Sequence, residues 1–259
     1  RPPGTLQAEL TAACSLPAHR SLQLNDRYPA DTTRTRLTAT LRYDNLWQRE
    51  HSASVGYQTA PEDTDDVTVL FGTYTARLGT SPWILSAYAV DSDTAVSTVG
   101  TLGVLGNGQI GGLRFIRPLP MLAGGFQRAT LGVDLKDFDE SIALTGNQPS
   151  IETPVQYGVL SAGWGWTLRG EDSVTDLSVI GTFGPRFLGN DAEEFSNKRS
   201  GAKPSFAYLG FTVTHERDAW LDTALRTAVG GQFAGAPLIS NEQVAIGGAT
   251  TVRGYLESE

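Results

Sequence analysis

The sequence lacks several features that would place it in common functional classes. No run of 18 apolar residues occurs, so no transmembrane helix is expected. The single cysteine, Cys14, excludes an internal disulfide, and the three histidines have no zinc-type spacing, so neither a metal nor another cofactor is predicted. A net charge of −8 argues against nucleic acid as a partner, because phosphate binding requires a basic surface. The glycines of residues 100–112 precede no Lys-Ser/Thr pair, which argues against a nucleotide loop.

What the sequence has instead is a hydrophobic period of two. The clearest case is the stretch 34–44, in which Leu37, Leu41 and Tyr43 share one face and arginines and threonines share the other. Similar stretches predict about eleven strands, at 21–25, 34–44, 51–60, 66–77, 83–92, 108–117, 125–138, 153–169, 173–183, 203–216 and 219–234. The chain is therefore predicted to be all-β.

The connections between these strands alternate in length. Turns near 45–48, 78–81, 170–172 and 217–219 are short, whereas 93–107, 139–152, 184–202 and 235–259 are long. Alternation of this kind is typical of an up-and-down antiparallel barrel whose long loops all lie at one rim.

The strand faces indicate a membrane barrel. Each face of charged residues suits either the solvated outside of a sandwich or the wet lumen of a barrel with lipid outside. Predicted strands of ten or more residues favour the barrel, because about 9–11 tilted residues span a bilayer. The residues predicted to face the lumen are Arg36, Arg42, Arg128, Asp134, Lys136, Asp222 and Arg226.

Aromatic residues gather beside the short turns. Tyr43, Trp47, Trp83, Phe126 and Trp220 all lie there, as in the interfacial belt of a membrane protein. The alternative is that aromatic residues simply suit strands.

The C-terminal stretch carries a motif of a different kind. Its residues are Gly247, Gly248, Val252, Arg253, Gly254 and Tyr255. Glycines allow tight turns, and a lone arginine presents a planar fork that suits a buried carboxylate. We expect a loop tip that is pushed into the barrel with Arg253 anchored inside; a solvated hairpin tip with one surface arginine is the alternative.

The predicted strand number indicates a piece of a longer protein. A closed antiparallel bacterial barrel has an even number of strands, and an unpaired edge in lipid is untenable. We therefore expect further strands after residue 259, and a domain boundary near residue 18.

Four stretches make the chain resemble the outer-membrane transporters of two-partner secretion, the hemolysin and hemagglutinin secretion/activation family within the BAM-type barrel superfamily. They are residues 16–27, 41–48, 131–138, and 243–248 leading into Val-Arg-Gly-Tyr at 252–255. The resemblance implies an antiparallel transmembrane β-barrel with about 11 of an expected 16 strands in this chain. Residues 1–18 would then be the end of a POTRA module and its linker, 19–234 strands one to eleven, and 235–259 the start of the long inward-folding extracellular loop. In relatives the loop arginine meets an acidic residue on a later strand, which for Arg253 would lie past residue 259.

The resemblance implies an outer-membrane pore that secretes a large β-helical exoprotein, of the adhesin or hemolysin type, without nucleotide. Its partners would be that exoprotein and outer-membrane lipid. An assembly factor that inserts other barrels is the alternative within the superfamily. A barrel enzyme is not predicted, because His19, His51 and His215 fall at the short-turn rim and no Gly-x-Ser-x-Gly motif occurs.

Overall fold

The chain folds into one curved antiparallel sheet in a computed structural model, which describes residues 16–26, 33–94, 97–98, 104–105, 107–139, 141–142, 151–219 and 223–244. The eleven strands of the sheet are β1 (Ala18–Asn25), β2 (Arg36–Leu46), β3 (His51–Thr59), β4 (Val67–Arg77), β5 (Ile84–Thr94), β8 (Gly108–Leu122), β9 (Gly125–Phe138), β12 (Val155–Arg169), β13 (Ser173–Gly184), β14 (Phe206–Asp218) and β15 (Ala224–Ala234). The predictions of an all-β fold and of eleven strands are confirmed.

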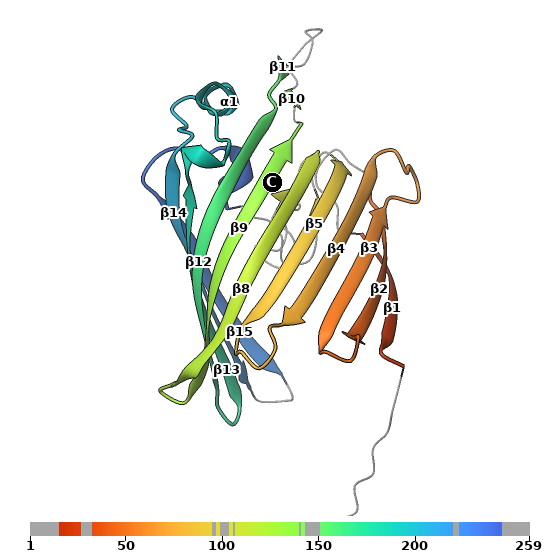
Figure 1. Ribbon diagram of the computed structural model, residues 1–259, viewed down its shortest axis with the longest axis vertical. Helices are drawn as coiled ribbons and strands as arrows, with labels where there is room; N and C mark the ends of the chain where they lie inside the picture. The colour runs from red at the N-terminus through yellow and green to blue at the C-terminus, as the bar shows by residue number, and fades with distance from the viewer. Residues whose placement is uncertain are drawn as a thin grey trace, which may run out of the picture.

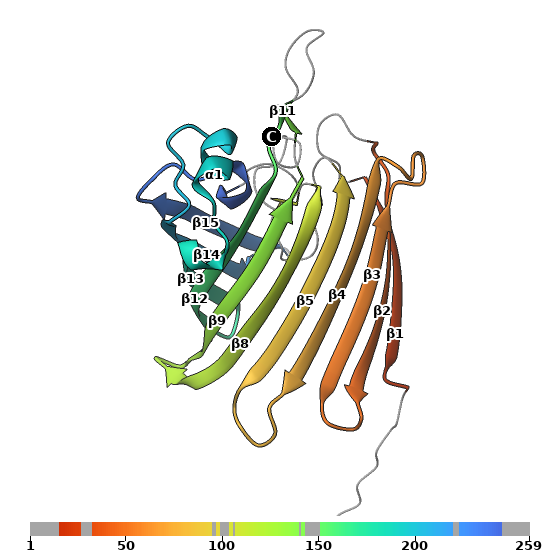
Figure 2. The ribbon, with the colours of Figure 1, turned by 45° about the horizontal axis from the view of Figure 1, so that its top comes forward.

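Each strand of the sheet pairs with the next one along the chain. The order is β1-β2-β3-β4-β5-β8-β9-β12-β13-β14-β15, with every pair antiparallel, so the sheet is an up-and-down meander that curls around a central space (Figures 1 and 2). Two additional pairs of two-residue strands, β6 (Ser97–Thr98) with β7 (Val104–Leu105) and β10 (Ser141–Ile142) with β11 (Ile151–Glu152), lie in the long connections. In the described part of the chain, β1 and β15 are the two ends of the sheet and are not paired with each other.

The two rims of the sheet differ as the sequence predicts. One rim, the short-turn rim, has tight connections such as Ala123–Gly124, where both residues adopt positive φ angles of 49° and 77°. The opposite rim, the long-loop rim, carries the connections after β1, β3, β5, β9 and β13 and the segment after β15. The connection after β13 contains two short helices, η1 (Arg186–Leu188) and α1 (Ala192–Lys198), which the sequence pattern did not predict.

Strand β8 is longer than predicted, since it continues from residue 117 to Leu122 through two prolines. Pro118 and Pro120 lack a backbone N–H and so cannot donate to a ladder. Neighbouring β5 begins at Ile84, which pairs with Ile116, so the end of β8 pairs with β9 alone. Proline is tolerated in this extension because it has a strand on one side only.

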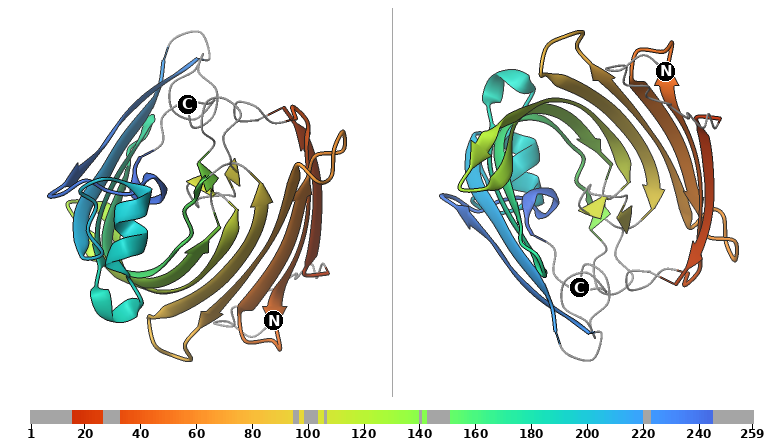
Figure 3. Two further views of the ribbon diagram at one scale, coloured as in Figure 1. Left: turned by 90° about the horizontal axis from the view of Figure 1, so that it is seen from above. Right: turned by 90° about the horizontal axis from the view of Figure 1, so that it is seen from below.

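The curvature gives the sheet an inner and an outer face (Figure 3). The inner face is the one that contacts the segment 235–244 after β15, and the strand registers define it across the sheet. Its members are the even-numbered residues of β2, β3, β5, β8, β9, β13, β14 and β15 and the odd-numbered residues of β1, β4 and β12.

Large apolar side chains cover much of the outer face. The exposed ones are Leu22, Leu24, Leu41, Tyr43, Val55, Tyr57, Leu70, Leu113, Phe115, Leu131, Leu135, Leu160, Phe183, Leu209, Leu225, Val229 and Phe233. A continuous exposed apolar surface of this extent is foreign to a protein surrounded by water. It is the arrangement of a barrel that turns its apolar side to lipid.

Among the described residues, the apolar packing of the inner face lies near the long-loop rim. Val69, Ile110, Phe138 and Tyr157 lie there at the heart of a buried apolar cluster, which Phe195 of α1 joins. Farther from that rim the inner residues are mainly serine, threonine, glycine and charged residues. The packed half and the polar half of the inner wall therefore offer different environments.

Four of the sequence predictions lie outside the described residues. They are the end of a POTRA module before residue 16, Trp220 of the aromatic belt, Asp222, and the loop motif at 247–255. Within the described residues, no helix is both long enough and apolar enough to cross a membrane.

Candidate functional site

The central feature of the inner wall is the carboxylate of Glu242, in the 3-10 helix η2 (Ser240–Glu242) of the segment after β15. Its side chain is only 1% exposed, and its Oε1 accepts from Lys136 Nζ at 2.5 Å. The hydroxyl of Tyr157 also donates to Oε1, at 2.6 Å, and the hydroxyl of Tyr208 donates to Oε2, at 2.8 Å. Lys136, Tyr157 and Tyr208 come from β9, β12 and β14, so one carboxylate joins three strands to a loop.

Gln232 of β15 holds the backbone on both sides of this carboxylate. Its amide Nε2 donates to the Glu242 carbonyl at 2.7 Å, and its Oε1 accepts from the Val244 N–H at 3.2 Å. Gln232 lies two residues before the end of β15, so the chain turns back across the inner face immediately after the strand ends.

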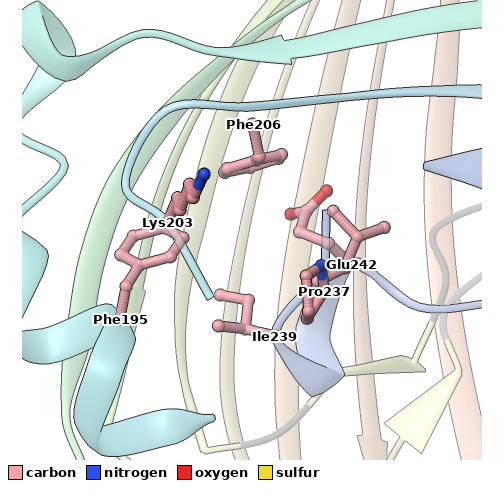
Figure 4. Close-up of a pocket in the computed structure, with 7 residues that line it drawn as sticks. Phe195, Lys203, Phe206, Pro237, Ile239 and Glu242 are labelled. Atoms are coloured by element: carbon pink, nitrogen blue, oxygen red, sulfur yellow. The ribbon is translucent and has the colours of Figure 1, made fainter. Parts of the chain in front are cut away.

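Apolar packing places α1 over the same part of the wall. The ring of Phe195 lies 5.5 Å from the ring of Tyr157 and 5.7 Å from the ring of Phe206, measured between centroids. Leu238 and Ile239 complete the packing, and Figure 4 shows Phe195, Phe206 and Ile239 converging beside Glu242. The side chains of this cluster pack against one another, with the Glu242 carboxylate buried beside them.

Local sequence explains why α1 forms in this long loop. Asp191 is its N-cap, and the Asp191 carboxylate accepts from the N–H groups of Glu193 and Glu194. Two contacts attach the loop to β12: Glu194 Oε2 accepts from the Gln156 N–H at 3.0 Å, and Asn190 Oδ1 accepts from the Gly158 N–H at 2.9 Å. The connection after β13 is therefore fastened to the part of β12 that precedes its pairing with β13.

A second polar cluster lies at the middle of β5, β8 and β9. Arg114 donates to both oxygens of Asp134, with 2.7 Å between Nη2 and Oδ2. The hydroxyl of Tyr88 donates to Asp134 Oδ1 at 2.5 Å. Gly112 lies directly between these side chains, because a Cβ there would meet both the Tyr88 ring and the Asp134 carboxylate.

A patch of hydroxyls, the hydroxyl wall, lies beside that cluster on β3, β4 and β5. Its residues are Ser52, Ser54, Thr73, Thr75 and Ser86, all on the inner face. The hydroxyls of Ser54 and Thr73 are 2.7 Å apart, and those of Thr75 and Ser86 are 3.4 Å apart. Each hydroxyl has one hydrogen and two lone pairs, so these pairs leave acceptor and donor capacity toward the interior.

At the long-loop rim, two carboxylates bind the start of β2. Asp66 Oδ2 accepts from the Thr33 N–H at 2.8 Å and from its hydroxyl at 2.7 Å, and these bonds lower the pKa of Asp66 below its usual value. Glu62 accepts in the same way from the hydroxyl and N–H of Thr35, and the pKa of Glu62 is lowered for the same reason. The loop after β3 is thus fastened to the strand β2.

The structure places the described residues that were predicted to face the lumen on the inner face. They are Arg36, Arg42, Arg128, Asp134, Lys136 and Arg226. It brings two of them into the clusters above, Asp134 with Arg114 and Lys136 with Glu242.

The four arginines have other surroundings. Arg36 is 3% exposed and donates to the carbonyls of Thr33 and Thr35, so it stabilises the residues that lie directly before β2. Arg42 is exposed and pairs with Asp44 two residues on, at 2.8 Å. The exposed Arg128 and Arg226 face the polar half of the interior.

Sequence reasoning missed the residues that complete the clusters: Tyr88, Arg114, Tyr157, Tyr208, Gln232 and Glu242. Arg114 could have been placed from the sequence, because the alternation of the segment 108–117 puts it on the same face as Gly112. Tyr157 and Tyr208 stand in mid-strand on the polar face, where a hydroxyl needs a partner. Nothing local pairs Glu242 with Lys136, which precedes it by 106 residues.

Histidines do not gather at any site on the inner wall. His19 pairs with Asp44 at the start of β1, His51 meets Tyr74, and His215 meets Thr175. In the ranges that the structure covers, no three His, Cys, Asp or Glu residues lie close enough to bind a metal ion.

Comparison with known proteins gives a consistent picture. The family model for the haemolysin secretion/activation protein ShlB/FhaC/HecB matches residues 7–259. Among solved structures, CdiB from Escherichia coli is similar, with a TM-score of 0.73 and 16% sequence identity over 95% of this chain and 46% of that chain. This chain therefore spans about half the length of the solved relative. No curated protein sequence matches it.

Proposed function

The chain belongs to the haemolysin secretion/activation family of outer-membrane β-barrel transporters, and on that premise we propose that it forms most of the wall of a two-partner secretion pore. The pore exports a large β-helical exoprotein of the adhesin or haemolysin type, and the export needs no nucleotide. The protein resides in the outer membrane of a Gram-negative bacterium.

The observation that carries this proposal is the contrast between the two faces of one sheet. The outer face exposes leucines and aromatic residues on nearly every strand, whereas the inner face is polar and charged in the half that lies farther from the long-loop rim. Lipid is the favourable environment for the apolar outer face, and water is the favourable environment for the polar inner face. The long-loop rim then faces the outside of the cell.

The hydroxyl wall supplies a surface along which an unfolded chain can slide. Serine and threonine hydroxyls donate and accept, so they match both the N–H and the C=O groups of an extended polypeptide. Because Ser54, Thr73 and Ser86 carry no charge, their contacts are weak and independent of the sequence in transit. A surface of this kind guides a polypeptide without retaining it.

The remaining parts of the chain have proposed roles within this pore. Residues 1–18 are the end of a POTRA module and its linker, and residues 19–234 are the first eleven strands. Residues 235–259 begin the inward-folding loop, whose Arg253 meets an acidic residue farther along the parent protein. The protein is not an enzyme in this proposal, which needs no chemical step.

The alternative is an assembly factor that inserts other barrels into the membrane. The family match favours secretion over insertion. The two proposals predict different clients: one exported exoprotein for a secretion pore, and many outer-membrane barrels for an assembly factor.

The proposal is tested by cross-linking in cells that make the full-length parent protein and a stalled exoprotein. A photoreactive amino acid at Thr73, on the hydroxyl wall, is expected to cross-link to the exoprotein. The same amino acid at Leu70, on the outer face of the same strand, is the matched control and should cross-link to lipid only. Loss of outer-membrane barrels on deletion of the gene, with no exoprotein cross-link, would instead indicate the assembly factor.

A further inference from the structure

We propose that Glu242 is a positioning residue that latches α1 and the segment 235–244 to the inner wall as one cap. The cap covers the long-loop half of the interior, and release of Glu242 uncovers it. This inference rests on the proposed pore, but its primary test does not need the exported protein.

The first argument is the chemistry of the Glu242 contacts. A carboxylate that is 1% exposed has lost its water, and Lys136, Tyr157 and Tyr208 replace that water with three charge-assisted hydrogen bonds. Neutralising the carboxylate leaves Lys136 buried without its counter-charge, so the docked state loses more than one bond.

The second argument is that side chains attach the described residues 235–244 to the wall. The strand ladder between β14 and β15 ends at Ala234, and the backbone hydrogen bonds of the described residues 235–244 join the segment to itself. Its polar contacts with the wall include those of Gln232 and Glu242. An attachment of this kind can be broken without unpairing a strand.

The third argument is that the two parts of the cap hold each other. Arg199, directly after α1, donates from Nη1 to the Leu238 carbonyl at 2.7 Å. Phe195 packs with Leu238 and Ile239 in the same apolar cluster. Movement of the segment 235–244 therefore removes part of the surface that supports α1, and the two parts are expected to move together.

The latch explains the unequal halves of the interior. The hydrogen bonds of Glu242 in the cap go to β9, β12 and β14, and the apolar cluster that the cap joins also includes Val69 of β4 and Val90 of β5. In the closed state the cap covers part of the inner wall near the long-loop rim. Release of the latch widens the passage at the long-loop rim.

The test measures conductance of the full-length parent protein in planar lipid bilayers. Glu242→Gln is expected to raise the open fraction by about tenfold or more, because one charge-assisted hydrogen bond is worth roughly tenfold in an equilibrium and this variant weakens more than one. Tyr208→Phe removes a single donor and should give a smaller rise in the same direction. The matched control is Glu193→Gln, which neutralises an exposed carboxylate on α1 and should leave the open fraction unchanged.

Heat-induced mobility shift on gels reports whether each variant is folded. Unchanged conductance in folded Glu242→Gln and Tyr208→Phe would overturn the latch, and so would a lowered unfolding midpoint without a change in gating. Secretion is scored separately. If the variants open more often but wild-type protein exports no exoprotein, the latch stands and the secretion function fails.

Discussion

Arg114 on β8 and Asp134 on β9 form a two-pronged ion pair on the inner wall, and Tyr88 on β5 donates to the same carboxylate. Three neighbouring strands are thereby tied at one level of the barrel. The side chain of Asp134 is 7% exposed and that of Arg114 is 23% exposed, so the pair is largely removed from water.

The first prediction concerns this pair. Asp134→Asn is expected to destabilise the full-length protein by about 3 kcal/mol, because it leaves a half-buried guanidinium without a counter-charge. The double variant Arg114→Gln with Asp134→Asn should be less destabilised than Asp134→Asn alone. Urea midpoints of the folded band on gels measure both, with the exposed Arg128→Gln as control. If the stability lost by the double variant equalled the sum of the losses of Arg114→Gln alone and Asp134→Asn alone, the coupling between the two residues would be contradicted.

The second prediction uses two adjacent glycines of β8. At Gly112 a new Cβ would meet the Tyr88 ring and the Asp134 carboxylate, whereas at Gly111 nothing lies within 4 Å. Gly112→Ala is therefore expected to lower stability by about 1–3 kcal/mol through overpacking. Gly111→Ala should be neutral or slightly stabilising, since alanine suits a strand better than glycine. Equal midpoints for the two variants would show that the inner face is not packed as described.

The third prediction concerns pH at the long-loop rim. Hydrogen bonds from Thr33 lower the pKa of Asp66, so Asp66 stabilises the clamp only while it is ionised. That contribution is fully present above the unfolded pKa of about 3.9 and is lost as the pH falls through the lower pKa of the folded state. Hydrogen exchange of the Thr33 amide, corrected for its intrinsic pH dependence, should show constant protection from pH 7 to pH 5 and loss below about pH 4. Asp66→Asn should lower the protection at neutral pH; equal protection in both proteins would refute the clamp.

The fourth prediction separates the two faces of β9. Leu131 is 52% exposed on the outer face and Thr130 faces inward. Leu131→Arg is expected to cost about 2–4 kcal/mol in lipid vesicles, as for an arginine near the middle of the bilayer. Thr130→Arg should cost little, because the neighbouring inner-face residues are mainly small or polar. If the outer face were exposed to water, the free-energy costs of Leu131→Arg and Thr130→Arg would be equal. Equal costs in vesicles would therefore place β9 outside the membrane.

The strands and the lengths of the turns could be predicted from the sequence because both depend on residues that are neighbours in the chain. Alternation along β9 placed Asp134 and Lys136 on one face, and the registers put that face inside. The same rule failed at the end of β8, where pairing on one side only admits Pro118.

The side-chain contacts that join the loops to the inner wall could not be predicted from the sequence. Glu242 lies in a loop whose local pattern is polar, and its three partners come from strands 34 to 106 residues away. Helix α1 is seven residues long and gains its place from Phe195, which packs on distant strands. Such contacts depend on how the sheet curls, which no single stretch of sequence records.

Export itself is the most direct measurement of the central claim. The full-length parent protein would be reconstituted alone in lipid vesicles, and the proposed exoprotein, in unfolded form, presented at the short-turn rim without nucleotide. The proposed pore predicts that the exoprotein crosses the bilayer and becomes accessible to protease only on the far side. Vesicles with folded barrels in which the exoprotein never crosses would contradict a secretion pore.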